Sequence, residues 1–157
     1  MLNRKANRYK GYNYSSPGYY FVTICTKDRL SFFGKIEDGK MILNEYGEIV
    51  KKCWLEIPEH FSRIKIEEFV IMPNHFHGII IIDDFVENRH ACSLRDVNEN
   101  RQHQKLPVII GSFKSAVTKI IHRKYESSFQ WQKSYYDHII RNESSLNNIR
   151  QYIRQNP

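Results

Sequence analysis

The sequence predicts an α+β fold, namely a ferredoxin-like or RRM-like antiparallel sheet with helices on one face and an added C-terminal helix. Two observations predict it. The chain has 157 residues, which suits one compact domain over residues 1–157. Hydrophobic patterns typical of strands and of helices follow in the order strand, helix, strand, strand, helix, strand, helix. The first six give the β-α-β-β-α-β order of the ferredoxin-like arrangement, and the seventh is additional.

The first strand and the first helix lie in the N-terminal third of the chain. Residues Tyr19–Thr26 are rich in aromatic and β-branched side chains, which favours a strand. A hairpin is expected around Asp38 and Gly39. Asn44 is suited to cap the next helix, in which apolar residues recur at helical spacing as far as Pro58, where we expect the helix to end.

Two further strands are predicted at Ile64–Met72 and His75–Asp83, joined by a turn at Pro73 and Asn74. The isoleucine run in the second strand lacks alternation, which is typical of a central strand buried on both faces. The chain then becomes polar, and residues 84–105 are expected to form a flexible or functional loop.

The C-terminal part of the chain completes the predicted sheet. We expect a helix at Leu106–Tyr125, a strand at Phe129–Ile140 and a last helix capped by Asn142. This last helix is the addition to the β-α-β-β-α-β order.

The charge balance favours an anionic partner. The net charge is +7, and 13% of the residues are aromatic. Nucleic acid is the commonest partner of such a protein, although many basic proteins bind no particular anion. Each candidate DNA contact has an equally simple role as a solvated cation or a structural histidine; the candidates are Arg4, Lys5, Arg8, Lys10, Lys114 and His138.

Cysteine usage and hydropathy indicate a cytoplasmic protein with no membrane partner. Cys25, Cys53 and Cys92 are odd in number and far apart, so we expect reduced thiols and no disulfide framework. No apolar stretch is long enough to span a bilayer, and the N-terminal residues lack the apolar run of a signal peptide.

Two histidines stand on one predicted strand. His75 and His77 are two residues apart, so both imidazoles are expected on the same face. That geometry can present two nitrogens to one metal ion, with Gly78 sparing room beside them. The spacing alone fits two unrelated histidines near a strand end at least as well.

Tyr152 and Asn156 are four residues apart on the last predicted helix, so they are neighbours on one face. A phenol and an amide oxygen could then meet the same metal ion or phosphate. The alternative is that Tyr152, beside the apolar Ile149 and Ile153, is a tyrosine at the edge of the core.

Three motifs together resemble those of the REP-associated tyrosine transposases, which belong with the single-tyrosine, His-hydrophobic-His transposases of small bacterial insertion sequences. The motifs are MPNHFH (Met72–His77), WQKSYYDHIIRN (Trp131–Asn142) and IRQYIRQNP (Ile149–Pro157). The resemblance runs from about Gly11 to the last residue, interrupted by the polar loop. Three motifs in the correct order make it specific, where one alone would not.

The resemblance implies an RRM-like sheet and cleavage of single-stranded or hairpin DNA through a 5′-phosphotyrosine intermediate. It implies that Tyr152 is the nucleophile, that His75 and His77 hold a divalent metal ion, Mg²⁺ or Mn²⁺, and that Asn156 is the third ligand. Relatives often continue past the position of Pro157, so no DNA contact from such a tail is expected here. Relatives from insertion sequences are dimers that exchange active-site helices, while the REP-associated branch need not be, which leaves a homodimer open.

Two other functions stay open at this point. A catalytically silent RRM-like module could bind nucleic acid by base stacking on its aromatic side chains. A metal-dependent phosphodiesterase could use water as the nucleophile, with Tyr152 merely structural. No P-loop or Rossmann glycine pattern occurs, so no nucleotide cofactor is expected.

Overall fold

The computed structural model describes residues 8–83 and 105–157. Its main sheet contains β1 (Gly18–Cys25), β4 (Ile64–Met72), β5 (His75–Ile82) and β6 (Tyr136–Ile140). The strand order is β4-β5-β1-β6, and every neighbouring pair is antiparallel. Counted among these four strands, the order is 2-3-1-4, so the predicted ferredoxin-like arrangement is confirmed.

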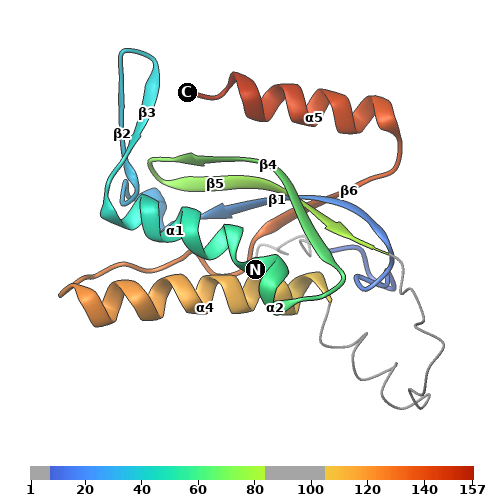
Figure 1. The fold of residues 1–157 in the computed structure, drawn as a ribbon, viewed down its shortest axis with the longest axis horizontal. Helices are drawn as coiled ribbons and strands as arrows, with labels where there is room; N and C mark the ends of the chain where they lie inside the picture. Colours follow the sequence, from blue (N-terminus) through green and yellow to red (C-terminus); the bar gives the residue numbers. More distant parts are fainter. Residues whose placement is uncertain (1–7, 84–104) are drawn as a thin grey trace, which may run out of the picture.

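Helices cover both faces of this sheet (Figure 1). The helices α1 (Glu45–Leu55) and α4 (Leu106–Lys124) lie on one face, and α5 (Glu143–Gln155) crosses the other. Asn44 caps α1 as predicted, since its side-chain oxygen accepts from the amides of Tyr46 and Gly47, both at 3.0 Å. A short hairpin, β2 (Gly34–Glu37) with β3 (Lys40–Leu43), stands apart from the main sheet.

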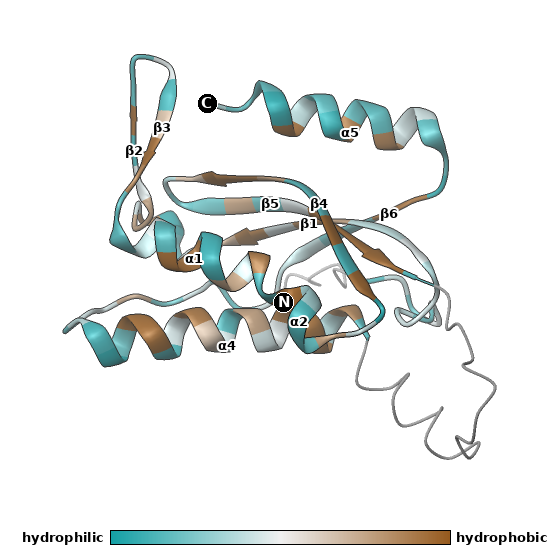
Figure 2. Cartoon of the chain, in the orientation of Figure 1, coloured by the Kyte–Doolittle hydropathy of each residue, from teal (hydrophilic) through white to brown (hydrophobic). Residues whose placement is uncertain are grey.

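Alternation along the strands divides the apolar residues between the two faces. Phe76, Ile80 and Ile82 of β5 enter the large core under α1 and α4, while Ile79 enters a smaller cluster under α5. In Figure 2 the apolar segments follow the strands and alternate with polar ones along the helices. The large core also contains Tyr20, Val22, Ile24, Val50, Trp54, Ile109, Ile110, Phe113, Val117, Ile121 and Phe129.

Two predicted elements are corrected by the structure. The strand expected at Phe129–Ile140 contains only Tyr136–Ile140, because Ser134 has a left-handed φ of 71° that interrupts the extended chain. The helix expected to reach Pro58 ends at Leu55, and Pro58 instead lies in the first turn of a second short helix, α2 (Ile57–His60).

Other sequence predictions depend partly on residues outside those described. Cys25 and Cys53 are free and buried, whereas Cys92 and the predicted loop over 84–105, except Lys105, lie outside the described residues. Among the helices described, none combines the length and the apolar character needed to cross a membrane.

Candidate active site

The histidine pair lies at the start of β5, on the face that α5 crosses. His75 and His77 project from the same side, as their spacing predicts, and their ring centroids are 4.8 Å apart. The absence of a side chain at Gly78 leaves space on the opposite face of the sheet, because a Cβ added there would lie 2.5 Å from Trp54. The expectation that Gly78 spares space beside the histidines is therefore wrong, and this glycine serves the core.

Asn74 fixes the protonation pattern of His75. Its Nδ2 donates to the carbonyl of Arg29 at 3.1 Å, which assigns the other side-chain atom as the oxygen. That oxygen lies 2.7 Å from Nδ1 of His75 and accepts its hydrogen. A neutral His75 therefore carries its lone pair on Nε2, the atom left for a ligand.

Thr23 of β1 performs a similar function for His77. Its hydroxyl lies 2.8 Å from Nδ1 of His77, its register partner on β5. A hydroxyl can donate or accept, so it is compatible with a lone pair on Nε2 of His77. Phe21, two residues earlier on β1, stacks on the same imidazole with centroids 5.3 Å apart.

Both imidazoles are held in the neutral form. His77 is only 6% exposed, and burial, followed by the charge of His75, lowers its pKa to about 4. Burial and the nearby charge of Arg29 also lower the pKa of His75. Neutral imidazole is the form that binds metal ions, whereas a pKa near 4 is unsuited to a general base at neutral pH.

Helix α5 brings Tyr152 to the histidines. Asn142 caps its first turn as predicted, accepting from the amide of Ser145 at 2.8 Å. Leu146 and Ile153 are buried against the sheet. The hydroxyl of Tyr152 then lies 3.3 Å from Nε2 of His77.

Two ion pairs fasten α5 on either side of Tyr152. Nε of Arg150 is 2.9 Å from Glu67, and Nε of Arg154 is 2.9 Å from Glu68. Both glutamates lie where the β4–β5 register shifts, between Ile66 and Phe69. This bulge lets two consecutive side chains of β4 meet the same helix.

Tyr152 is accessible as well as close to the pair. It is 49% exposed, and its ring meets those of Phe21 and His77 edge to face. The histidines and the tyrosine belong to one chain, so this arrangement does not require a helix from a second copy. A phenol, two neutral imidazoles and open access from solvent are compatible with chemistry on an extended substrate.

Asn156 is the C-cap residue of α5. Its Nδ2 donates to the backbone carbonyl of Tyr152 at 2.7 Å, which ties it to the same turn of the chain. The described residues contain no group of three or more His, Cys, Asp or Glu side chains that could hold a metal ion. The role of Asn156 as a third metal ligand stays a prediction, because the contact described for its side chain is with Tyr152 and not with either histidine.

Two other tyrosines, Tyr135 and Tyr136, are the nearest rivals of Tyr152 as a nucleophile, and the structure places them on opposite faces of the sheet. Tyr135 belongs to the large core, and burial raises its pKa, which disfavours it as a nucleophile. Tyr136 is 48% exposed and pairs with Thr23 in the register, so it lies on the site face. His138 is exposed and pairs with Phe21, which places it on that face as well.

The candidate cations are distributed unevenly. Arg4 and Lys5 lie outside the described residues, Arg8 lies over the ring of Tyr135 with its guanidinium carbon 4.6 Å from the centroid, and Lys10 is exposed. The ammonium of Lys114 donates to two backbone carbonyls, at 2.8 and 2.9 Å. Lys114 therefore has a structural function whatever else it contacts.

Sequence reasoning missed Thr23, Phe21 and Asn74 as parts of the site. Asn74 lies within the MPNHFH motif, so its place beside a histidine was a usable signal. Thr23 is 54 residues from His77 in the sequence, and only the strand pairing shows their contact.

Comparison with known proteins gives related sequences and a related fold. The chain matches no protein-family model. A Haemophilus influenzae protein named "Uncharacterized protein" is 42% identical over 159 residues, covering 99% of this chain and 88% of that protein. A second Haemophilus influenzae protein, named "Putative REP-associated tyrosine transposase", is 25% identical over 146 residues, covering 92% and 73% of the two chains. The solved structure of a REP-associated tyrosine transposase bound to a REP hairpin has a TM-score of 0.56 and 18% identity, covering 93% and 69%.

Proposed function

We propose, because the chain belongs with the REP-associated tyrosine transposases, that it cleaves and rejoins single-stranded DNA through Tyr152 with a divalent metal ion at His75 and His77. The observation that carries the proposal is the 3.3 Å separation between the hydroxyl of Tyr152 and Nε2 of His77. It brings the IRQYIRQNP and MPNHFH motifs together within one chain, although 75 residues separate the two side chains.

The proposed reaction is a transesterification. The phenolic oxygen of Tyr152 forms a bond to phosphorus, and the bond from phosphorus to the 3′-oxygen breaks. The proton lost by the phenol is replaced on the departing 3′-oxygen through solvent, to which Tyr152 is open. The products are a 5′-phosphotyrosine and a free 3′-hydroxyl. Attack by a 3′-hydroxyl reverses the step and rejoins DNA without a nucleotide cofactor.

A metal ion bound there would neutralise charge on the phosphate oxygens and make phosphorus more electrophilic. His75 and His77 would hold it through Nε2, since Asn74 and Thr23 occupy the two Nδ1 atoms. Asn156 would supply a third ligand through its amide oxygen. Imidazole ligands suit Mn²⁺ better than Mg²⁺, which prefers oxygen.

Hairpin DNA is the substrate class that we propose. The net charge of +7 supports an anionic partner, and a solved protein of the same fold is bound to a REP hairpin. The active site needs only one chain in this arrangement, and the homodimer stays a prediction to be checked by sedimentation.

The deciding experiment incubates the protein with labelled single-stranded hairpin DNA and Mn²⁺ and separates the products on a denaturing gel. The wild-type chain is expected to give a covalent protein–DNA band. Tyr152→Phe removes only the hydroxyl, so it should bind DNA and metal as before and give no band. Tyr136→Phe is the matched control, because Tyr136 is equally exposed on the same face, and it should retain the band.

The other outcomes identify the alternatives. Hairpin binding with no adduct and no cleavage in any variant would indicate a silent binding module. Cleavage that persists in Tyr152→Phe would indicate hydrolysis by water. Replacing both His75 and His77 with Ala should abolish Mn²⁺ binding in calorimetry, and unchanged affinity would contradict the proposed metal site.

A further inference from the structure

A basic surface lies on the opposite side of the sheet from α5. It is an open groove of about 610 Å³ between α4 and the segment that precedes β6, and we call it the α4 groove. Its lining includes three lysines and two glutamines but no carboxylate. The lining residues are Lys114, Ser115, Thr118, Lys119, Gln130, Trp131, Gln132, Lys133 and Ser134.

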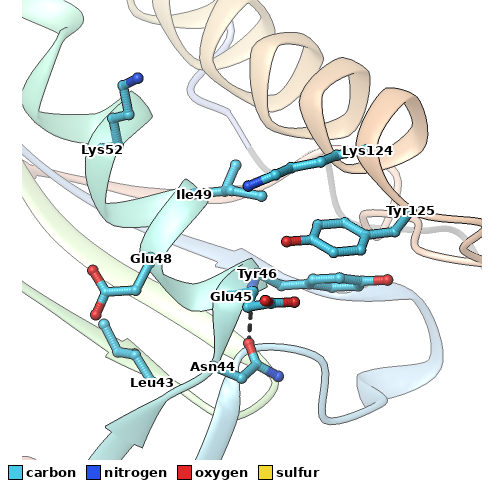
Figure 3. Close-up of a pocket in the computed structure, with 9 residues that line it drawn as sticks. All are labelled: Leu43, Asn44, Glu45, Tyr46, Glu48, Ile49, Lys52, Lys124 and Tyr125. Atoms are coloured by element: carbon cyan, nitrogen blue, oxygen red, sulfur yellow. Dashed lines mark hydrogen bonds between the residues drawn. The ribbon is translucent and has the colours of Figure 1, made fainter.

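The charge of the α4 groove distinguishes it from a larger hollow at the C-terminal end of α4. That hollow, of about 780 Å³, lies between the start of α1 and the end of α4 (Figure 3). Its lysines, Lys52 and Lys124, are accompanied by Glu45 and Glu48, so its charges offset one another. The α4 groove instead presents a surface of one sign, which favours an anion.

The walls of the α4 groove are fixed by hydrogen bonds. Lys114 donates to the carbonyls of Gln132 and Ser134, and the indole N–H of Trp131 donates to the carbonyl of Lys114 at 3.2 Å. The ammonium of Lys114 is therefore occupied. Lys119 and Lys133 are exposed and form no ion pair within residues 8–83 and 105–157. These two lysines are the cations that a ligand would meet.

Backbone pairing at the end of β1 connects the segment that lines the α4 groove to the turn before His75. Trp131 forms a bridge with Thr26, and the amide of Thr26 donates to the carbonyl of Asn74 at 3.0 Å. Asn74 adjoins His75. Two inter-strand spacings, about 10 Å, therefore separate the backbone of Trp131 from that of Asn74. At about 3.4 Å per nucleotide of one strand in a duplex, roughly three nucleotides span this distance, and fewer in an extended strand.

We propose that the α4 groove binds the sugar–phosphate backbone of the single-stranded DNA that flanks the cleaved phosphate. The proposal rests on the function proposed above, because that function supplies the strand. Lysines act on phosphate as point charges without a planar fork for base edges, so the contact is expected to be independent of sequence. An exposed basic groove whose backbone lies about 10 Å from that of Asn74 fits a strand that passes the site and turns around the end of β1.

The test measures binding to two labelled DNA probes, a hairpin with a single-stranded flank and the same hairpin without one. Lys119→Ala with Lys133→Ala is expected to weaken binding of the flanked probe and to leave the unflanked probe unchanged. Each contact to a single strand contributes about 0.7 to the slope of log affinity against log salt. The double variant should therefore lower the slope for the flanked probe by about 1.4.

The matched control is Lys40→Ala with Lys51→Ala, which removes the same two charges from exposed positions on β3 and α1. It should leave the flank-dependent part of the binding and its salt slope unchanged. Lys133→Glu alone provides a second variant at an exposed position in case the double variant is unstable. Equal affinity and slope for the flanked probe in both double variants would overturn the proposal.

The two proposals fail in different ways. One outcome is a covalent adduct from the wild-type chain together with flank binding that does not depend on Lys119 and Lys133. That outcome would contradict the proposal for the α4 groove and support the transesterification. Loss of flank binding in the groove variant, with no adduct from the wild type, would support the groove and contradict the transesterification.

Discussion

The face of the sheet under α1 and α4 and the face under α5 hold their helices by different means. Under α1 and α4 a continuous core contains fully buried aromatic residues such as Trp54, Phe76 and Phe129. Under α5 the buried set is small and aliphatic, consisting of Ile79, Ile140, Leu146 and Ile153. Ion pairs supplement it, and the candidate active site lies beside it. One face therefore supports the fold, while the other holds the residues of the candidate site.

The largest expected effect is a loss of stability from the α1 and α4 face. Trp54 is fully buried and packs on Phe76, with ring centroids 4.4 Å apart. Trp54→Ala should lower the free energy of unfolding by about 3–5 kcal/mol, because it removes a large apolar surface and leaves a cavity. Denaturant unfolding followed by far-UV circular dichroism measures it.

Leu55→Ala is the control for that experiment, since Leu55 neighbours Trp54 in α1 but is about half exposed. It should change stability by no more than about 0.5 kcal/mol. Equal losses in the two variants would mean that the core under α1 does not dominate stability.

The second prediction concerns metal affinity and leaves the core untouched. Thr23→Val keeps the shape of the side chain but removes the hydroxyl 2.8 Å from Nδ1 of His77. Partners that orient a ligating histidine typically contribute 10–100-fold to metal affinity. We therefore expect a loss of about 10–100-fold in Mn²⁺ affinity by calorimetry.

Thr23→Ser restores the hydroxyl and should recover most of the affinity lost in Thr23→Val. The free energy of unfolding of the metal-free Thr23 variants should change far less than that of Trp54→Ala, since Thr23 faces the site. If Thr23→Val binds Mn²⁺ as tightly as the wild type, Thr23 has no part in orienting His77 for the metal ion.

The fold was predictable from the sequence because the spacing of apolar residues within each segment distinguishes a strand from a helix. The same-face placement of His75 and His77 follows from the two-residue period of a strand, and the caps at Asn44 and Asn142 follow from residue type. The strand before α5 was predicted too long, because its aromatic composition continues through Ser134, whose left-handed backbone the pattern does not show.

The parts of the site that were not predictable depend on distant pairs. Glu67 and Arg150 are 83 residues apart, and their contact requires both the bulge in β4 and the path of α5. Neither the bulge nor the path of α5 produces a hydrophobic period in the sequence. Tyr152 was recognisable as a candidate by spacing and by motif, but its 3.3 Å approach to His77 depends on the assembled sheet. The ligand role of Asn156 stays a prediction.

The smallest expected effects come from the ion pairs that hold α5. The Glu67–Arg150 pair is bidentate, and its side chains are about a quarter exposed, whereas Arg154 of the other pair is mostly exposed. A surface ion pair changes an opening equilibrium by up to about fivefold, and a better ordered, bidentate pair lies at the upper end of that range. We therefore expect Glu67–Arg150 to contribute more than Glu68–Arg154 to closing α5 on the sheet.

Two double-mutant cycles measure the contributions, using Glu67→Gln with Arg150→Gln and Glu68→Gln with Arg154→Gln. Hydrogen exchange of the α5 amides reports local opening, because a helix held by few buried contacts can open without global unfolding. The coupling in both cycles should fall as salt rises, since these charges are near the surface. The covalent-adduct rate should follow the same order, because an open α5 carries Tyr152 away from His77. Equal couplings that salt does not change would show that apolar packing alone holds α5. The two faces would then differ only in the amount of apolar surface that they bury.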